Sequence, residues 1–342
     1  MNVSATETPN IYQCFCERQI LAAIFSIIAI VGVLGNMLVL VSIIITKRLR
    51  TTTNIFVFNL SVADLATCLM LPLSTVLPIL SLDGYPLHNT LCVFSAFMMI
   101  TCIGTSVNTL ACIAVNRLLR ITKTLEFYYR IYKTVNIVAI LFATWASPAA
   151  VAMVPLVSSV GTLGYEPKYG ICLWLSDSGI YTFLAVLVCY PIQLTLMLYS
   201  YGKVFYYVRN TSRALVESDN VQTLSAQISQ SNMHRYQNSN TSLVLKHRLA
   251  KRQIALTKNL FCVVCAFLLC LTPYALNLVV PCSGEALPYS AAILTFNSCV
   301  NPIIYAAKHP DFKRSFKEIL CCKVWSLPEN KSKINYSRNA TR

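Results

Sequence analysis

Long apolar runs constrain this chain more than any other feature of its sequence. Seven such runs alternate with shorter polar stretches along the 342 residues. An α-helix rises about 1.5 Å per residue, so about 20 apolar residues cross the ~30 Å hydrocarbon layer of a bilayer. The sequence therefore predicts an all-α membrane protein, a bundle of seven transmembrane helices near residues 19–46, 54–80, 88–122, 134–156, 179–208, 250–280 and 287–307.

Composition argues against a soluble protein of two domains. Hydrophobic residues make up 56% of the chain and charged residues only 12%, too few to cover a soluble surface. The 15 cysteines are scattered, many of them inside apolar runs, and lack the paired CxxC spacing of a zinc site. We expect most of them to be small buried hydrophobic side chains.

The positions of the positive charges predict the orientation. A net charge of +15 would suit nucleic acid, but all Lys and Arg residues except Arg18 and Lys168 fall at one end of the predicted helices or in the tail. This is the bias of the positive-inside rule, so no nucleic-acid partner is expected. Segment 1–18 is expected outside the cell, and the third cytoplasmic loop at about 209–249 and the tail at 308–342 inside. No removable signal peptide is apparent, and we expect a multi-pass protein of the plasma membrane.

The segments outside the bundle carry candidate modification sites. Asn2 begins a glycosylation sequon on the outer side. Residues 211–245 are rich in Ser, Asn and Gln, which favours a disordered loop with phosphorylation sites. Beyond the seventh helix, Phe312 and Phe316 are four residues apart with basic residues between them. This pattern predicts a short amphipathic eighth helix on the inner membrane face, with Cys321 and Cys322 as palmitoylation sites; the alternative is an unmodified tail.

Cysteines at the outer side are candidates for disulfides. The 25 residues from Cys92 to Arg117 span about 37 Å of helix, which puts these residues at opposite membrane surfaces. Cys92 can then meet Cys172 in the second outer loop, where the compartment is oxidising; the alternative is two free structural cysteines. One of Cys14 and Cys16 could bridge to Cys282 and leave an odd thiol.

One short motif in each helix resembles a known receptor family. Asn116-Arg117-Leu118 resembles the Asp-Arg-Tyr motif of rhodopsin-like G-protein-coupled receptors. The other hallmarks follow in order: Gly35-Asn36, the stretch 59–65, Trp145, Pro191 with Tyr199, Phe267 with the stretch 270–273, and Asn301-Pro302-Ile303-Ile304-Tyr305. The resemblance covers the whole chain. The Asn-Arg pair, the Ile-Thr stretch after it and residues 129–132 further resemble melatonin receptors, the fly trapped-in-endoderm group and the medium-chain fatty-acid receptor.

The resemblance implies a receptor that passes the signal of an extracellular ligand to a heterotrimeric G protein. Arrestin, receptor kinases and membrane lipid would be further partners. Arg117 would be the contact that switches, among the residues Asn116, Arg117, Leu118, Tyr199, Asn301, Pro302 and Tyr305. Asn116 and Gln253 replace two acidic residues of the family, which predicts a weakened resting state and basal signalling. The alternative is that Asn116 and Gln253 hold Arg117 by neutral hydrogen bonds.

Asp64 is the only acidic residue deep inside a predicted span. A buried carboxylate costs several kcal/mol unless it is paired or neutralised. The family likeness gathers Ser106, Asn297, Ser298 and Asn301 around it as an allosteric sodium pocket that stabilises the resting state. The alternative is a protonated carboxyl satisfied by hydrogen bonds. No other metal and no cofactor is expected.

The family likeness also places a ligand pocket at the outer side. Met99 stands where amine receptors carry Asp, and Thr295 where opsins carry the retinal-binding lysine, so neither an amine nor retinal is expected. Leu271 replaces a Trp that senses ligand in the family. The expected lining is mostly apolar and favours a neutral or lipophilic small ligand, with a peptide as the alternative: Met99, Ile100, Ile103, Phe183, Leu187, Leu271, Tyr274, Leu278, Ala291 and Thr295.

Two other classes of membrane protein fit the sequence less well. Transporters and channels usually carry several ionisable groups inside the membrane, or broken helices in repeated halves. This sequence has one buried acid and no internal repeat. A membrane enzyme is disfavoured because the four histidines lie at helix ends or in loops, without HExxH or a nucleophile–base pair.

Overall fold

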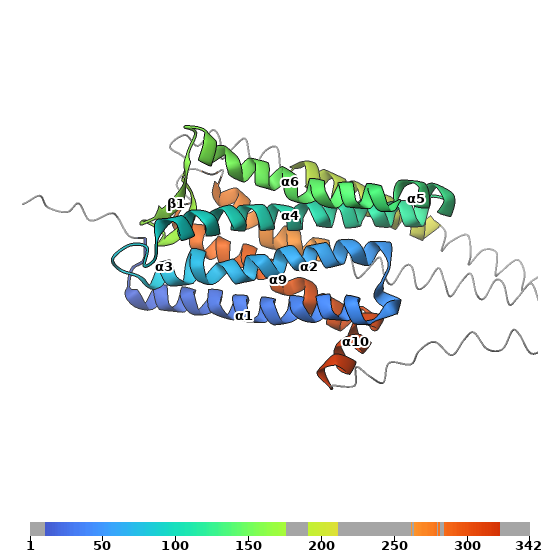
Figure 1. Ribbon diagram of the computed structural model, residues 1–342, viewed down its shortest axis with the longest axis horizontal. Helices are drawn as coiled ribbons and strands as arrows, with labels where there is room; N and C mark the ends of the chain where they lie inside the picture. Colours follow the sequence, from blue (N-terminus) through green and yellow to red (C-terminus); the bar gives the residue numbers. More distant parts are fainter. Residues whose placement is uncertain are drawn as a thin grey trace, which may run out of the picture.

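The structure is a bundle of long helices lying side by side (Figure 1). It is a computed structural model, and it describes residues 11–175, 191–210, 261, 263–278, 280 and 284–321. Within these residues, five helical stretches are long and apolar enough to cross a membrane. They are α1 (Phe15–Ile45), α2 (Thr52–Leu71) with its continuation to Leu80, α4 (Asn89–Thr122), α6 (Thr134–Val157) and α9 (Leu287–Lys308).

The two remaining predicted spans are helical where the structure describes them. Residues 191–210 form a helix in the fifth predicted span, and the apolar helix Val263–Leu278 lies in the sixth. A further helix, α10 (Pro310–Leu320), follows α9 and buries Phe312, Ser315 and Phe316. The described residues therefore confirm five of the predicted spans and parts of the other two, and α10 is a helix where the eighth was expected; its contact with the membrane stays a prediction.

The two ends of the bundle carry different small elements. A two-stranded antiparallel hairpin, β1 (Thr162–Glu166) and β2 (Ile171–Leu175), lies at the end that also holds α3 (Leu77–Leu80) (Figure 1). At the opposite end lie α10 and α5 (Leu125–Ile131), a helix that the apolar pattern did not predict because it is much shorter than a membrane span. Thr124 caps α5 by accepting a hydrogen bond from the backbone of Phe127.

The second span contains a wide turn. Pro72 lacks a backbone N–H and cannot continue the i→i−4 pattern. The segment Pro72–Val76 is π-helical, and the N–H of Leu77 donates to the carbonyl of Pro72 five residues before it. The span therefore continues as a helix, with one extra residue in this turn, to the end of α3.

Polar contacts and small residues hold the helices together. Trp145 in α6 donates to Asn59 in α2 at 2.9 Å, and Asn59 donates to Thr109 in α4 at 2.8 Å.

Large apolar side chains such as Ile27 and Leu34 on α1 and Val135 on α6 are exposed. In a bundle without lipid around it, such exposure marks the faces that meet the hydrocarbon layer.

Candidate functional site

Asp64 lies at the centre of the bundle and is almost completely buried. Its Oδ1 accepts hydrogen bonds from the hydroxyl of Ser106 at 2.8 Å and from that of Ser298 at 3.2 Å. Its Oδ2 accepts from the side-chain amide of Asn301 at 2.8 Å. The carboxyl group of α2 thus draws together α4 and α9.

Two oxygen atoms of the residues expected in this pocket lack donors. The side-chain oxygens of Asn297 and Asn301 are buried and have no hydrogen-bond partner within the described part of the chain. Asn301 also donates to Asp64, so its unsatisfied oxygen belongs to a residue that contacts the carboxylate, and such an acceptor is suited to a hard cation with oxygen ligands. No cluster of three or more His, Cys, Asp or Glu side chains occurs in the described ranges, so a cation here would rely on a single carboxylate.

Arg117 ends the buried part of α4 at the end of the bundle where α5 and α10 lie. It is only 9% exposed. Its Nε is buried and meets no hydrogen-bond acceptor among the residues that the structure describes. The hydroxyl groups of Tyr201, Tyr128 and Tyr305 are close enough to interact electrostatically with its charge. A buried cation with an unsatisfied donor costs free energy, and an added hydrogen-bond acceptor would lower that cost.

The expected switch residues are brought together only in part. Tyr305 is buried in α9 and its hydroxyl, like that of Tyr201, has no partner among the described residues. Tyr199, which the motif singled out, is instead 57% exposed and lies beside Lys203. Tyr201 takes the place expected for Tyr199. The helical turn in the fifth span decides which tyrosine points inward, and the motif alone could not show it.

Asn116 does not hold Arg117, contrary to one alternative considered for the sequence. Its side-chain oxygen accepts from Thr53 in α2 at 2.7 Å, and its side-chain nitrogen donates to the hydroxyl of Tyr128 in α5 at 3.0 Å. Both polar atoms are therefore engaged elsewhere. The reason is that α2 and α5 bring the hydroxyl groups of Thr53 and Tyr128 within hydrogen-bond distance of the Asn116 amide. Gln253 lies outside the described residues.

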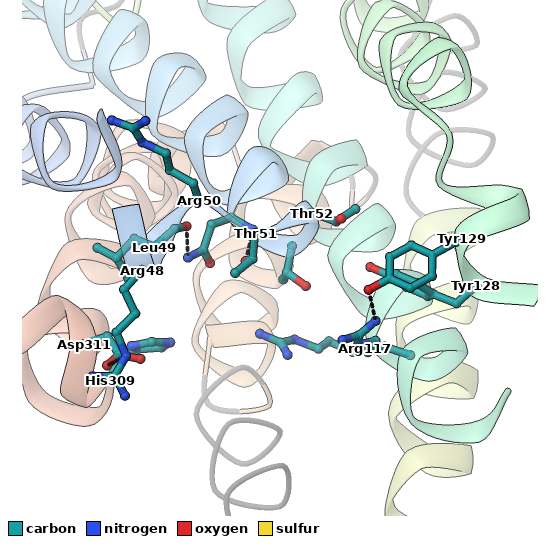
Figure 2. Close-up of a pocket in the computed structure, with 13 residues that line it drawn as sticks. Arg48, Leu49, Arg50, Thr51, Thr52, Arg117, Tyr128, Tyr129, His309 and Asp311 are labelled. Atoms are coloured by element: carbon teal, nitrogen blue, oxygen red, sulfur yellow. Dashed lines mark hydrogen bonds and ion pairs between the residues drawn. The ribbon is translucent and has the colours of Figure 1, made fainter. Parts of the chain in front are cut away.

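A cavity of about 430 Å³ opens beside Arg117 (Figure 2). Arg117, Tyr128 and Tyr129 lie on one side of it, and Arg48 and Asp311 on the other. Four arginines and one aspartate contribute to the lining, together with residues of the first turn of α2. The complete lining is Arg48, Leu49, Arg50, Thr51, Thr52, Thr53, Asn54, Arg117, Arg120, Tyr128, Tyr129, His309 and Asp311.

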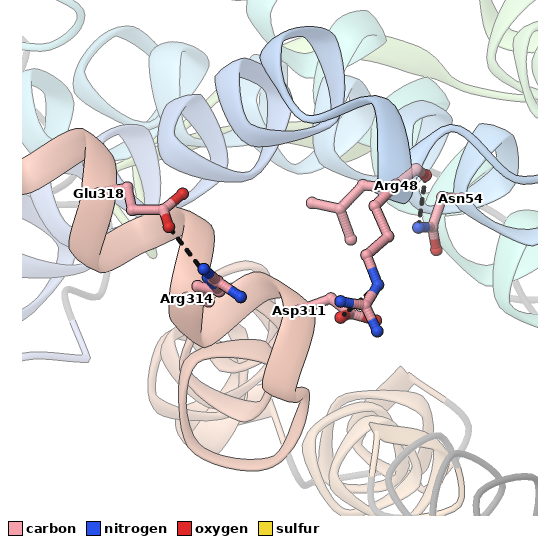
Figure 3. A network of polar contacts seen from close by, with 6 residues as sticks. Arg48, Asn54, Asp311, Arg314 and Glu318 are labelled. Carbon is pink, nitrogen blue, oxygen red and sulfur yellow. Dashed lines mark hydrogen bonds and ion pairs between the residues drawn. The ribbon is translucent and has the colours of Figure 1, made fainter. Parts of the chain in front are cut away.

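One ion pair and one ring contact join α10 to its neighbours beside this cavity (Figure 3). Arg48, in the loop after α1, pairs with Asp311 of α10 at 3.1 Å. Arg314 pairs with Glu318 within α10 at 3.0 Å. The ring of Phe312 stacks on Tyr305 of α9 with 5.2 Å between ring centres. The first inner loop and α9 therefore both contact α10, and these contacts stabilise its position.

The expected ligand-lining residues are spread along the outer half of the bundle. Met99 and Ala291 pack against one apolar cluster, whereas Ile103, Leu271 and Tyr274 belong to or pack against another. Ile100 packs near Cys92 and Cys172, and Thr295 donates to the carbonyl of Ala291 at 2.9 Å. Leu278 is half-buried, and Leu118 of the inner motif is half-buried as well. Phe183 and Leu187 lie outside the described residues.

The disulfides agree with one expectation and correct another. Cys92 of α4 is bonded to Cys172 of β2, which ties the hairpin to the bundle. Cys14 is bonded to Cys16, so neither can bridge to Cys282. The correction has a simple cause, because the start of α1, with Cys14 as its N-cap and Cys16 in its first turn, brings the two Cα atoms within 5.4 Å. Cys282, Asn2 and Cys322 lie outside the described residues, and Cys321 is exposed.

Arg18 is a buried residue that the sequence suggested only as an outer charge. It is 6% exposed; its Nε donates to the carbonyl of Ile79 at 2.6 Å and its Nη2 to that of Ser81 at 2.8 Å. Its guanidinium lies 5.5 Å from the ring centre of Tyr12, whose hydroxyl donates to the carbonyl of Tyr169 at 2.6 Å. Burial raises the pKa of the Tyr12 hydroxyl above its ordinary value, so this donor keeps its proton.

Comparison with known proteins agrees with this arrangement. The family described as "7 transmembrane receptor (rhodopsin family)" matches residues 35–305. The octopamine receptor beta-2R of Chilo suppressalis is 28% identical over 316 residues, which cover 88% of this chain and 79% of that one. The melatonin receptor type 1A of Mus musculus is 29% identical over 313 residues, 88% of this chain and 80% of that one.

A solved structure shares the fold. The crystal structure of squid rhodopsin superposes with a TM-score of 0.74 and 18% identity, and covers 97% of this chain and 92% of that one. At this identity the likeness shows the arrangement of helices alone. The match from residue 35 to residue 305 takes in the Asp64 network, the Arg117 end and the disulfide of the hairpin. The chain is thus a multi-pass membrane protein that belongs to the rhodopsin family of G-protein-coupled receptors.

Proposed function

We propose that this receptor lies in the plasma membrane with its N-terminus outside, and that Arg117 passes the signal of a neutral or lipophilic ligand to the G protein. The observation that carries the switch role is the buried Arg117, whose Nε has no acceptor among the described residues. A G-protein segment that offers backbone or carboxylate oxygens would satisfy this donor. Movement of the sixth helix would open the way to it, with Pro273 as a kink that allows the movement.

The decisive experiment is a G-protein activation panel in cells that express the chain or its Arg117→Ala variant. We expect ligand-independent or ligand-stimulated activation of at least one G protein by the wild type and its loss in the variant. Surface staining of both proteins controls for expression. Equal activation by the two proteins at equal surface levels would overturn the switch role of Arg117.

The character of the ligand is inferred from Met99. This residue packs against an apolar cluster with Ala291 and stands where amine receptors carry an acidic residue. The chain is similar both to an octopamine receptor and to melatonin receptors, and the missing counter-ion favours a ligand without a cationic amine. Screening should therefore find agonists among neutral lipophilic compounds. Activation by biogenic amines alone would refute this inference.

Sodium in the Asp64 pocket is the second part of the proposal. Asp64, Ser106 and the orphan oxygens of Asn297 and Asn301 would hold the ion, with Ser298 beside them. The ion would supply a positive charge that offsets the buried carboxylate and favours the resting packing of α2, α4 and α9. The melting temperature of the purified receptor should rise when sodium chloride replaces choline chloride at equal ionic strength. The Asp64→Asn variant should lose this rise; an equal rise in both would place the sodium effect elsewhere.

Arrestin, receptor kinases and membrane lipid complete the set of proposed partners. The phosphorylation sites expected for them lie in residues 211–245 and in the tail, outside the described residues. Cys321 is exposed directly after α10, in a position suited to a palmitoyl chain that would hold α10 against the inner membrane face. Labelling with a palmitate analogue, compared between wild type and a Cys321→Ser/Cys322→Ser variant, tests this attachment.

A further inference from the structure

The inner cavity has an excess of positive charge. Four arginines and one aspartate line its ~430 Å³. The aspartate, Asp311, is already paired with Arg48 at 3.1 Å. The remaining three arginines, Arg50, Arg117 and Arg120, have no carboxylate among the lining residues. A volume of this size is typical of small-molecule sites, and the charge favours an anion.

Arg117 presents an unused donor at this cavity. Its side chain is more than nine-tenths buried and lines the cavity, and its Nε has no hydrogen-bond partner among the described residues. A guanidinium has five N–H donors in a fixed plane, which match the oxygens of a phosphate group. Burial increases the strength of such a contact because solvent screens it less.

Arg120 stands one helical turn further along α4, on the same side. Its guanidinium lies over the ring of Tyr128 at 4.8 Å and over that of Tyr129 at 5.7 Å. Its Nη1 also donates a long hydrogen bond of 3.5 Å to the hydroxyl of Tyr129, and stacking on the rings holds the plane of the guanidinium so that its other N–H groups can donate at the edge. The tyrosines thus fix a second phosphate donor in place before any ligand arrives.

The first turn of α2 adds a third source of positive potential. Thr51 caps this helix by accepting from the N–H of Asn54, and Thr51, Thr52 and Thr53 all line the cavity. The first N–H groups of a helix lack intrahelical acceptors, and the helix dipole makes this end positive. Phosphate groups bind favourably at such positions.

We propose that this cavity binds an anion with two or more phosphate groups, held by Arg117, Arg120 and the first turn of α2. More than one phosphate is indicated because Arg117 and Arg120 of α4 and the first turn of α2 line a volume larger than a single phosphate needs. Such a ligand could be the headgroup of a phosphorylated inositol lipid of the inner leaflet or a soluble inositol phosphate. The site shares Arg117 with the proposed switch, but its occupancy is measurable without any G protein.

The test measures binding to the purified full-length receptor. One arm titrates radiolabelled inositol trisphosphate onto receptor in detergent. The other arm compares melting temperatures in nanodiscs that contain phosphatidylinositol bisphosphate with those in phosphatidylserine nanodiscs of equal net charge. Saturable trisphosphate binding supports a soluble ligand. A melting temperature raised only by the bisphosphate lipid, without trisphosphate binding, supports the lipid headgroup.

Matched variants locate the site. Arg120→Gln should weaken binding roughly tenfold or more, because it removes charge-assisted hydrogen bonds. Arg130→Gln is the control, since Arg130 lies in α5, is exposed, pairs with Glu126 at 3.5 Å and does not line the cavity. If Arg120→Gln fails to fold, Thr52→Glu serves instead, because an acidic residue in the first turn favours the helix but repels the anion. Absence of binding in both arms, equal stabilisation by phosphatidylserine, or an equal loss with Arg130→Gln would overturn the proposal.

Discussion

Arg18 and Asn116 each connect two or more elements of the bundle through hydrogen bonds that the sequence does not predict. The sequence presents Arg18 as an outer charge and Asn116 as the replacement of an acidic residue. In the structure both side chains are buried and bond to a neighbouring element. The hydrogen-bond partners of a side chain depend on the direction in which it points, and the periodicity of apolar residues does not give that direction. By contrast, three of the four residues that the family likeness gathers around Asp64, namely Ser106, Ser298 and Asn301, donate hydrogen bonds to it, because a lone buried carboxylate must find donors.

Replacing Arg18 by Met should lower the stability of the receptor by about 2–4 kcal/mol, since it removes two hydrogen bonds from a charged donor while it keeps an apolar stem. The melting temperature of the purified receptor in a fixed detergent reports the effect. Lys168→Met is the matched control, because Lys168 is the other outer cation and its ammonium group lies only over the ring of Tyr169. Equal losses in the two variants would contradict the role of Arg18 in connecting elements of the bundle.

Replacing Asn116 by Asp should lower basal G-protein activation, because a carboxylate beside Arg117 can pair with the guanidinium, whose Nε meets no acceptor among the described residues. Activation is measured without ligand at matched surface expression, against cells that carry an empty vector. Thr53→Val separates the causes, since it removes the hydrogen bond to Asn116 and adds no charge. A wild-type signal equal to the vector control would contradict the expectation of basal signalling.

At the scale of elements, the sequence predicts the long helices well and the short pieces poorly. Apolar runs near 20 residues leave few alternatives to a membrane helix. The helix α5 and the hairpin β1–β2 are short, and each is stabilised by a cap, a disulfide or packing against α4. Local pattern gives no signal of such tertiary support. The start of α1 lies at Phe15 instead of the expected residue 19 for a similar reason, because Arg18 is buried inside the first turns of the helix.

Glycine at a helix contact gives a prediction for the packing of α4 on α6. A Cβ atom at Gly104 would lie 2.5 Å from the Cβ of Pro148. Gly104→Ala should therefore destabilise the receptor by about 1–3 kcal/mol despite the better helix propensity of Ala. Gly202→Ala is the control, since nothing lies within 4 Å of the added atom, and it should be neutral or stabilising by up to ~1 kcal/mol. Melting temperatures that shift in the same direction would contradict this close packing.

At the scale of the whole molecule, the proposed orientation depends on features at the two ends of the bundle. The end that carries α5, α10 and the arginine-lined cavity is opposite the end that carries the disulfide-linked hairpin (Figure 1). Disulfides form in an oxidising compartment, and positive charges stay in the cytoplasm. These two rules are independent of each other, and they assign the same ends.

An epitope tag tests the orientation directly. A tag fused to the C-terminus should bind antibody only after the cells are permeabilised, because the tail follows α10 at the end rich in arginine. A tag at the N-terminus should bind antibody on intact cells. The comparison is made by flow cytometry on the same cell line. Staining of the C-terminal tag on intact cells would overturn the proposed topology.

The wide turn in the second span changes the direction of every residue that follows it in that span. One residue more in a helical turn rotates the following segment by about 100° around the helix axis. The carbonyl groups of Ile79 and Ser81 therefore face Arg18 only because Pro72 interrupts the regular spiral. Deleting one residue between 72 and 76 would restore the regular phase and turn those carbonyls away, so the angular setting of the outer mouth depends on a proline about two turns below it.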